Sequence, residues 1–433
     1  MRRPGGSFRP WWGLYGAEVP SATESDGSPV DPRSAMEVRD FRFLWLNTTA
    51  FMMLMNAQRF VFAWFVLDGL DHSEADQGLV VFAIGVPAIF LTLHAGVWAD
   101  RWNRKRLLIS TQAVQIATMG LLVVLITTDR ATFGWLLVLG FLSGSATTIG
   151  GPVRSSLVPA IVPRSVIYGA IALNAIGVTI SMVLGPVLAR LAGTVFGFEG
   201  AFGFMVGLVF VGLLVLVPLR VPPHEHVTES RPVRRDLADL WVWVGESAPV
   251  RKLLVLLSMA GVTIMPLGMI LMQAHVKDGL GRDSGDAAFP LATMGVGLAI
   301  TSLVVMRRGD LTNKGGWFMG ALVIGGSSVC AMGQTTALWQ MVALGLSMGL
   351  GGGLYMTMSQ GLLQTHTPQP LMGRMMAVFA LVQAGVTPLS ALIYGYVAES
   401  VGTGATMSVG GAACAVIAVV SLATDRSGLR SLG

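Results

Sequence analysis

Long apolar runs separated by short polar segments fill the chain from about residue 40 to residue 424. A helix that crosses a bilayer needs about 20 apolar residues, and we count twelve runs near or above this length. The pattern therefore predicts an all-α membrane protein with twelve transmembrane helices. The predicted helices are 43–67, 77–99, 106–127, 133–157, 166–192, 198–219, 251–275, 287–306, 316–334, 338–363, 373–399 and 402–424.

One long polar segment divides these helices into two sets of six, which predicts two six-helix bundles. The expected parts are a disordered cytoplasmic tail, an N-terminal bundle, a cytoplasmic linker, a C-terminal bundle and a second cytoplasmic tail, at 1–38, 39–219, 220–250, 251–424 and 425–433. Within the linker, apolar residues recur at helical spacing beside several arginines, which is typical of a short helix lying in the membrane interface. These apolar residues are Leu237, Leu240, Trp241 and Val244.

Charge is scarce and strongly one-sided. Only 12% of the residues are charged, against about 25% in soluble domains. Of 29 Lys and Arg residues, 24 fall in the tails and in the loops on one side, and Arg59 lies within the first predicted helix. The loops on the other side hold Arg130, Arg190, Lys277 and Arg282. By the positive-inside rule, both termini are expected in the cytoplasm, with the chain spanning the cytoplasmic (plasma) membrane many times.

The most distinctive polar stretch joins the second and third predicted helices. From Gly96 to Arg106 it reads G-x-x-x-D-R-x-x-R-K-R. One acid and four bases cannot lie in hydrocarbon, so this stretch is expected to be a turn at the membrane surface. Asp100 can accept hydrogen bonds from a neighbouring helix N-terminus, and Arg101 and Arg104 can pair with it or with lipid phosphates. The plain alternative is an ordinary basic loop without a special role.

This stretch resembles the signature loop of major facilitator superfamily transporters. Six further segments resemble the branch of that superfamily that holds enterobactin exporters and macrolide efflux pumps: residues 151–159, 162–164, 172–174, 184–186, 362–368 and 372–374. The resemblance covers about residues 40–424. It implies export of a drug, siderophore or metabolite by alternating access, and proton-driven antiport. It also implies a cytoplasmic gate made of Gly96, Asp100, Arg101, Arg104, Lys105, Gly373 and Arg374.

The resemblance further implies a central substrate cavity, lined by predicted helices 1, 4, 7 and 10 with 2, 5, 8 and 11 beside them. Polar residues within these helices are the candidates for its wall, although each could instead satisfy a neighbouring helix. They are Asn56, Arg59, Thr148, Asn174, Gln273, Tyr355, Gln360 and Gln383.

Arg59 is the one charge that we place inside a span. Sixteen residues of helix raise it roughly 24 Å above Phe43, and a guanidinium at such depth costs a few kcal/mol unless it meets water or a partner. Asn56, Arg59 and Ala63 share one face of the helix. Either Arg59 snorkels to the headgroups, or this face lines the cavity and attracts an anionic or catechol-like group.

Proton coupling has less support, because we place no acid deep in a helix. Asp68 ends the first predicted helix, His94 lies near the end of the second, and His275 ends the seventh. A carboxylate or histidine of this kind can exchange protons during transport, but a lone histidine near a helix end is more often structural. Coupling through one of these residues, or no coupling, remains open at this point.

The sequence has no motif for ATP hydrolysis, for catalysis or for metal binding. The sequence has no Walker motif, catalytic triad or His/Cys cluster, so we expect no enzyme activity, no cofactor and no metal. The expected partners are a small-molecule substrate, membrane lipid and protons, without nucleic acid, and the chain is expected to be a monomer. The 24 methionines either line an adaptable apolar cavity or face lipid. The alternative functions are a lipid or lysolipid flippase of the same fold and a non-transporting membrane receptor.

Overall fold

The structure is a computed structural model that describes residues 34–221, 240–241, 243–245, 247–308, 313–368 and 371–424. Across these residues the regular secondary structure is helical, and ten helical segments are long and apolar enough to cross a membrane. The predicted all-α membrane fold is confirmed.

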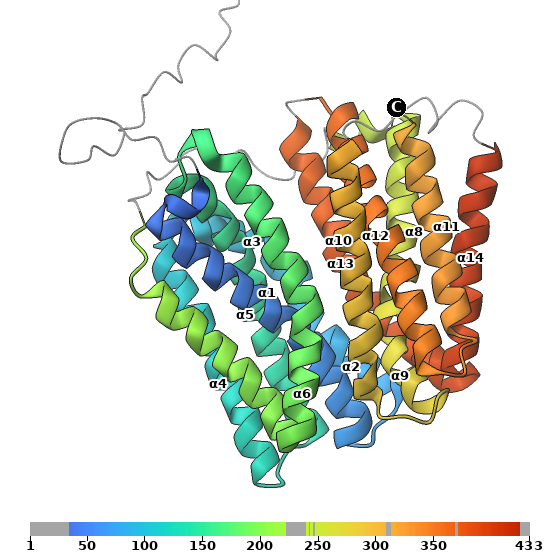
Figure 1. The fold of residues 1–433 in the computed structure, drawn as a ribbon, viewed down its shortest axis with the longest axis horizontal. Coiled ribbons are helices and arrows are strands. Elements are labelled where there is room, and N and C mark those ends of the chain that lie inside the picture. Colours follow the sequence, from blue (N-terminus) through green and yellow to red (C-terminus); the bar gives the residue numbers. More distant parts are fainter. Residues whose placement is uncertain are drawn as a thin grey trace, which may run out of the picture.

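The first half of the chain forms one group of helices, called the N-terminal group, in Figure 1. Its first helix continues through a short π-helical turn, η3 (Phe65–Gly69). Its α-helices are α1 (Arg39–Trp64), α2 (Glu74–Gly85), α3 (Pro87–Arg101), α4 (Arg104–Thr127), α5 (Phe133–Ile161) and α6 (Ile167–Leu216).

The second half forms the C-terminal group, which lies beside the first (Figure 1). Helix α2 of the N-terminal group packs against α13, and α6 packs against α10, so these two pairs form much of the boundary between the groups. The helices of the C-terminal group are α8 (Ala248–Met269), α9 (Leu271–Asp278), α10 (Ala288–Arg308), α11 (Lys314–Met332), α12 (Leu338–His366), α13 (Met372–Val401) and α14 (Thr403–Thr424).

Four of the predicted helices differ from the structure in their continuity: two are interrupted, and two run together. The second predicted helix is broken between α2 and α3, where Pro87 begins α3 and has no N–H to continue the hydrogen-bond ladder. The seventh is broken at Ile270, one turn after Pro266. The fifth and sixth run together as α6, with a sharp reversal at Gly197, whose φ of 70° suits a residue without a side chain.

These differences account for part of the gap between twelve predicted and ten observed spans. One of the ten, Gly169–Leu216, contains both the fifth and the sixth predicted helices. Helix α13 is not among the ten, although its 30 residues extend over roughly 45 Å and are long enough to cross a bilayer.

Successive spans run in opposite directions, with α2–α3 and α8–α9 each counted as one interrupted span, which gives the molecule two ends. The terminal end holds the start of α1, the end of α14 and the turn at 102–103 (Figure 1). The far end holds the turns at 70–73, 128–132, 279–283 and 333–337. Of the helix predicted in the linker, residues 240–241 and 243–245 are described and are helical. Leu240 and Val244 are buried against the C-terminal group, and Trp241 is exposed. Leu237 lies outside the described residues.

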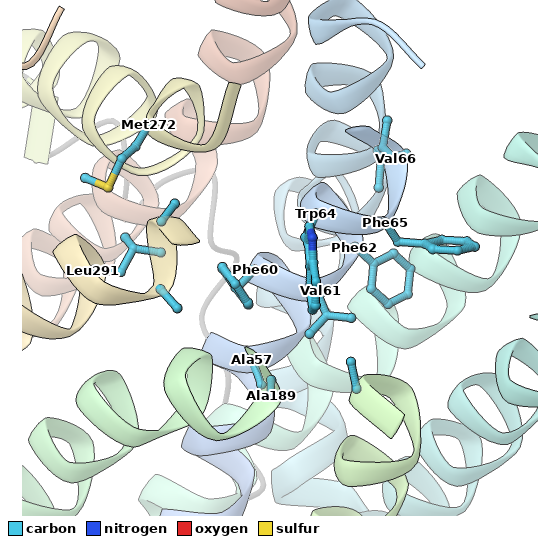
Figure 2. Close-up of a cluster of buried hydrophobic side chains, with 14 of the residues drawn as sticks. Ala57, Phe60, Val61, Phe62, Trp64, Phe65, Val66, Ala189, Met272 and Leu291 are labelled. Atoms are coloured by element: carbon cyan, nitrogen blue, oxygen red, sulfur yellow. The ribbon is translucent and has the colours of Figure 1, made fainter. Parts of the chain in front are cut away.

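A single apolar cluster joins the two groups around the last turns of α1. Figure 2 shows Phe60 of α1 on the side that faces Met272 and Leu291 of the C-terminal group, with Phe62 and Phe65 on the other side. The ring of Phe62 meets that of Phe202 in α6 edge to face, with ring centroids 5.4 Å apart. Helix α1 therefore belongs to the core of both groups.

Candidate functional site

A cavity of about 450 Å³ lies between the two groups and is lined by residues from both. This volume is in the range of sites that bind drug-sized molecules. Residues 55–63 of α1, 81–85 of α2, 144–148 of α5 and 178–186 of α6, with Ala88 of α3, contribute to one side, and helices α8 to α13 contribute to the other. The wall is largely apolar, and its methionines are Met55, Met182, Met265, Met269, Met294, Met348 and Met356.

The structure brings six of the eight predicted cavity residues to this wall: Asn56, Arg59, Thr148, Gln273, Tyr355 and Gln383. The other two are outside the lining: Asn174 is half-buried in α6, and Gln360 is exposed on α12. The Tyr355 hydroxyl donates to Gln383 Oε1 at 2.9 Å, which links α12 to α13 beside the cavity.

Arg59 carries the only charge among the lining residues that the structure describes. Asn56, Arg59 and Ala63 all line the cavity, as their shared helix face predicts. The Arg59 side chain is exposed, and no described carboxylate forms an ion pair with it. The guanidinium is therefore available to an anionic group that enters the cavity.

Two glutamines beside the cavity hold the groups together. Gln77 of α2 donates from Nε2 to the carbonyl oxygen of Ile270 at 3.0 Å and to Gln273 Oε1 at 3.3 Å. Gln273 of α9 donates to the Phe60 carbonyl oxygen of α1 at 3.0 Å. Sequence reasoning singled out Gln273 but missed Gln77 and Gln58, which also lines the cavity. A buried amide in an apolar run was the available signal, but Gln77 was taken for a helix end.

Ion pairs close the far end between the groups. Asp68, which lies in the π-helical turn, accepts hydrogen bonds from the backbone N–H of Ser284 at 2.9 Å and from its hydroxyl. Lys277 of α9 lies 3.0 Å from the Asp71 carboxylate and 4.0 Å from that of Asp68, and it also donates to the Leu67 carbonyl oxygen. The end of α1 is thus bound to the C-terminal group by charge and by hydrogen bonds.

A second set of ion pairs continues this closure from α6. Arg190 donates to Asp283 at 3.2 Å and to Asp286 at 3.0 Å, and its guanidinium stacks over the Trp64 ring at 4.7 Å. Arg282 meets the same Asp286 at 2.7 Å within the C-terminal group. Because Arg190 belongs to the N-terminal group, its two bonds cross the boundary.

Of the three candidates for proton coupling, Asp68 is the one for which the structure describes bonds across the boundary. His275 is buried in α9, with Nδ1 3.2 Å from the Thr403 hydroxyl and Nε2 without a described partner. His94 is exposed on α3, with Nδ1 2.9 Å from the Phe90 carbonyl oxygen.

The predicted gate at the terminal end is described only in part. Helix α3 ends at Arg101, and Asn103 caps α4 by accepting from the backbone N–H of Arg106 at 3.1 Å. Arg104 donates to the Ser156 carbonyl oxygen of α5 at 3.3 Å. Lys105 binds two carbonyl oxygens just after the end of α6, at 2.7 and 2.8 Å. The surroundings of Gly96, Asp100, Arg101 and Gly373 lie outside the description, and Arg374 lies in the first turn of α13.

One buried charge contradicts the expectation that Arg59 is alone inside a span. Arg154, which the charge count assigned to the loops although the fourth predicted helix, 133–157, contains it, lies within α5 and is 2% exposed. Its Nε donates to Asn47 Oδ1 at 3.0 Å, and its guanidinium lies over the Phe51 ring at 3.7 Å.

Comparison with known proteins identifies relatives over most of the chain. Residues 31–431 match the transmembrane secretion effector family. The chain is 29% identical to the MFS-type transporter YkuC of Bacillus subtilis over 179 residues, which is 41% of each protein. It is 22% identical to the enterobactin exporter EntS of Shigella boydii over 357 residues, or 82% of this chain and 84% of EntS. It thus spans less than half of YkuC and most of EntS.

Solved structures show the same fold. The nucleoside transporter NupG superposes with a TM-score of 0.72 at 12% identity, over 90% of this chain and 99% of NupG. A peptide transporter POT in complex with sulfate gives a TM-score of 0.72 at 14% identity, over 93% and 99%. These relatives and neighbours are transporters rather than enzymes. The chain belongs to the transmembrane secretion effector family and is a multi-pass membrane transporter of the major facilitator superfamily.

Proposed function

We propose that this transporter exports small amphipathic molecules that carry an anionic group, by alternating access between its two helical groups. The observation that carries the proposal is the cavity between the groups, which has an apolar wall and Arg59 as its charged residue. Drugs, siderophores and metabolites with an aromatic or aliphatic body and a negative group have this chemistry. Methionine side chains adapt to different shapes, which suits a broad range of such bodies.

The proposed direction, export, is supported by the likeness to EntS and is compatible with the end that is closed in this structure. Ion pairs and buried amides bind the groups together at the far end. We place the terminal end in the cytoplasm of a bacterial plasma membrane, on the charge bias of the loops and the bacterial origin of the relatives. In this arrangement the cavity loads from the cytoplasm, and opening of the far end releases the substrate outside. The name of EntS, an exporter, agrees with this direction.

We also propose that export is driven by proton entry through Asp68. Protonation of Asp68 removes the charge that holds Lys277, so it weakens the far-end closure on the side from which protons enter. In inverted vesicles, collapse of the pH gradient should stop accumulation of the exported compound, and Asp68→Asn should make the remaining transport insensitive to the gradient. Accumulation that continues without a gradient would reject proton antiport.

The test of the main proposal compares anionic and neutral probes. The full chain is reconstituted into proteoliposomes, and uptake of two radiolabelled probes is measured. The probes are hippurate, a small aromatic carboxylate, and its neutral methyl ester. Arg59→Gln should reduce hippurate transport by about tenfold, equivalent to ~1.4 kcal/mol, and Arg59→Lys should keep part of it. The control is Gln360→Leu, an exposed position outside the cavity lining.

A thiol reaction gives an independent readout at the same position. A cysteine introduced by Arg59→Cys, with Cys330 and Cys414 replaced by alanine, should react with a water-soluble thiol reagent and be protected by hippurate. Normal hippurate transport in Arg59→Gln, together with no protection of the introduced thiol, would show that Arg59 takes no part in substrate binding.

A further inference from the structure

Three glutamine side chains beside the cavity have no part in the attraction of an anion by Arg59. Gln58, Gln77 and Gln273 are 1%, 0% and 1% exposed. Primary amides rarely lie in such an apolar setting unless their hydrogen bonds are satisfied, because an unpaired amide loses its contacts with water and gains none. What these amides bind is therefore informative.

Two of the glutamines reach across the boundary in opposite directions. Gln77 extends from α2 to Ile270, at the break between α8 and α9, and to Gln273 Oε1. Gln273 extends back from α9 to the carbonyl oxygen of Phe60 in α1. Because these bonds are shielded from water, they must break or be replaced before the two groups can separate at this point.

Two atoms of these amides have no partner among the described residues. They are Gln58 Nε2 and Gln77 Oε1, and both are buried. Gln58 and Gln273 line the cavity, and Gln58 is the neighbour of Arg59 in the chain. Since an amide nitrogen can only donate, the group that satisfies Gln58 Nε2 has to be an acceptor. An uncharged acceptor that enters an apolar cavity with an anionic molecule is most simply a carbonyl oxygen.

We propose that Gln77 and Gln273 form a latch between the two groups, and that a substrate carbonyl releases it by accepting hydrogen bonds from Gln58 and Gln273. This rests on the proposed export function and narrows its substrate class to amphipathic anions that also carry an amide or ester carbonyl. The anionic group binds Arg59, and the carbonyl binds the glutamines.

The bond that Gln273 gives up when the latch opens does not leave its acceptor unpaired. Phe60 lies within α1, four residues before Trp64 at the end of that helix, so its carbonyl oxygen can still accept the helical hydrogen bond when Gln273 turns away. A ligand shifts a conformational equilibrium only by binding one state more tightly than the other. A carbonyl meets this condition, because Gln273 Nε2 is free to bind it only after the latch has opened.

Distances between spin labels at the far end can report the latch directly. Arg130 and Thr336 are exposed in far-end turns of different groups, so labels attached after Arg130→Cys and Thr336→Cys move apart when that end opens. The full chain is placed in lipid nanodiscs after Cys330 and Cys414 have been replaced by alanine. Two probes are compared, hippurate and 4-phenylbutanoate. Both join a phenyl ring to a carboxylate through three atoms, but hippurate alone has a carbonyl within that link.

Two results are expected. Without any probe, Gln77→Leu and Gln273→Leu each remove two of the hydrogen bonds that join the groups. Since one such bond contributes ~1 kcal/mol, each variant should raise the ratio of long to short distances by at least about fivefold. In the parent protein, hippurate should raise this ratio more than 4-phenylbutanoate does, and in Gln58→Leu the two probes should act alike.

The matched control is Gln115→Leu. Gln115 is also a buried glutamine, but its Nε2 donates to the Thr147 hydroxyl at 3.1 Å, within the N-terminal group. This variant should leave the distances unchanged. Size-exclusion profiles and thermal unfolding show which variants fold.

Unchanged distances in folded Gln77→Leu and Gln273→Leu would show that there is no latch. No response to hippurate, or an equal response to both probes in the parent protein, would overturn recognition of a carbonyl. These distances do not require transport, so a chain that fails to export hippurate still tests the latch separately from the export proposal.

Discussion

Among the contacts that the structure describes, the two ends of the molecule hold their helices in different ways. At the far end, Lys277 and Arg190 form ion pairs across the boundary between the groups. At the terminal end, Arg104 and Lys105 donate to backbone carbonyls of their own group, beside α5 and α6. Ion pairs between the two groups can break and form again as the groups move, whereas hydrogen bonds to the ends of helices keep each group rigid. The comparison indicates that the far end moves during transport, with each group moving largely as a unit.

Close backbone packing adds to the closure of the far end. A Cβ atom at Gly78 of α2 would lie 2.6 Å from the carbonyl oxygen of Ala391 in α13, and one at Gly395 would lie 2.6 Å from that of Glu74. Small residues of this kind let membrane helices approach closely. Close helix packing at the boundary therefore stabilises the closed state together with the ion pairs.

The largest effect is expected from Asp100 at the terminal end, on the strength of the sequence motif. Asp100→Ala should reduce transport of hippurate by at least about tenfold, or ~1.4 kcal/mol, while membrane insertion is unchanged. Initial rates in proteoliposomes measure this. Asp129→Asn, which changes an exposed acid at a far-end turn, is the control. Equal rates for Asp100→Ala and the parent protein would show that Asp100 takes no part in gating at the terminal end.

The next effect concerns the close packing of the far end. Gly78→Val places atoms against the Ala391 backbone, and overpacking of this kind costs about 1–3 kcal/mol. The closed state should lose about fivefold or more in population, seen as longer distances between the far-end spin labels. Gly120→Val in α4 is the control, because a Cβ there has no neighbour within 4 Å. A similar response in both variants would contradict a special role for the boundary.

A smaller shift is expected from the far-end charges. Lys277→Met leaves Asp68 and Asp71 without their base, and partly exposed pairs contribute at most about 1 kcal/mol. The far end should open about threefold to fivefold more often, and added salt should change the variant less than the parent, since salt screens the lost pair. If added salt changed the Lys277→Met variant as much as the parent protein or more, these charges would not hold the far end closed.

The smallest effect is expected from Arg282, whose ion pair with Asp286 stays within the C-terminal group and is half exposed. Arg282→Gln should change the free energy of unfolding by less than about 0.5 kcal/mol and leave the far-end distances as they are. Thermal unfolding and spin-label distances measure the two quantities. Opening of the far end in this variant would mean that charge alone, and not its position across the boundary, sets the closure.

Hydropathy predicted the all-helical fold because the bilayer requires long apolar helices with internally satisfied backbones. It missed the breaks at Pro87 and Ile270, because an apolar run looks the same whether its helix is straight or interrupted. The wall residues Arg59 and Gln383 could be found as polar positions inside apolar helices. Gln77 carried the same signal but was taken for the end of a helix, and its role was not visible because its partner lies almost two hundred residues away.

The seven methionines of the cavity wall give the transporter built-in spectroscopic reporters. Methionine ends in a mobile methyl group, whose carbon-13 resonance in a nuclear magnetic resonance spectrum is sharp even in large particles and shifts when an aromatic ring comes near. Met→Leu replacement costs little stability, so each signal can be assigned by its disappearance. A compound that enters the cavity should shift the signals of Met294 and Met348 while leaving methionines outside the wall unchanged. Occupancy could then be observed without any attached probe.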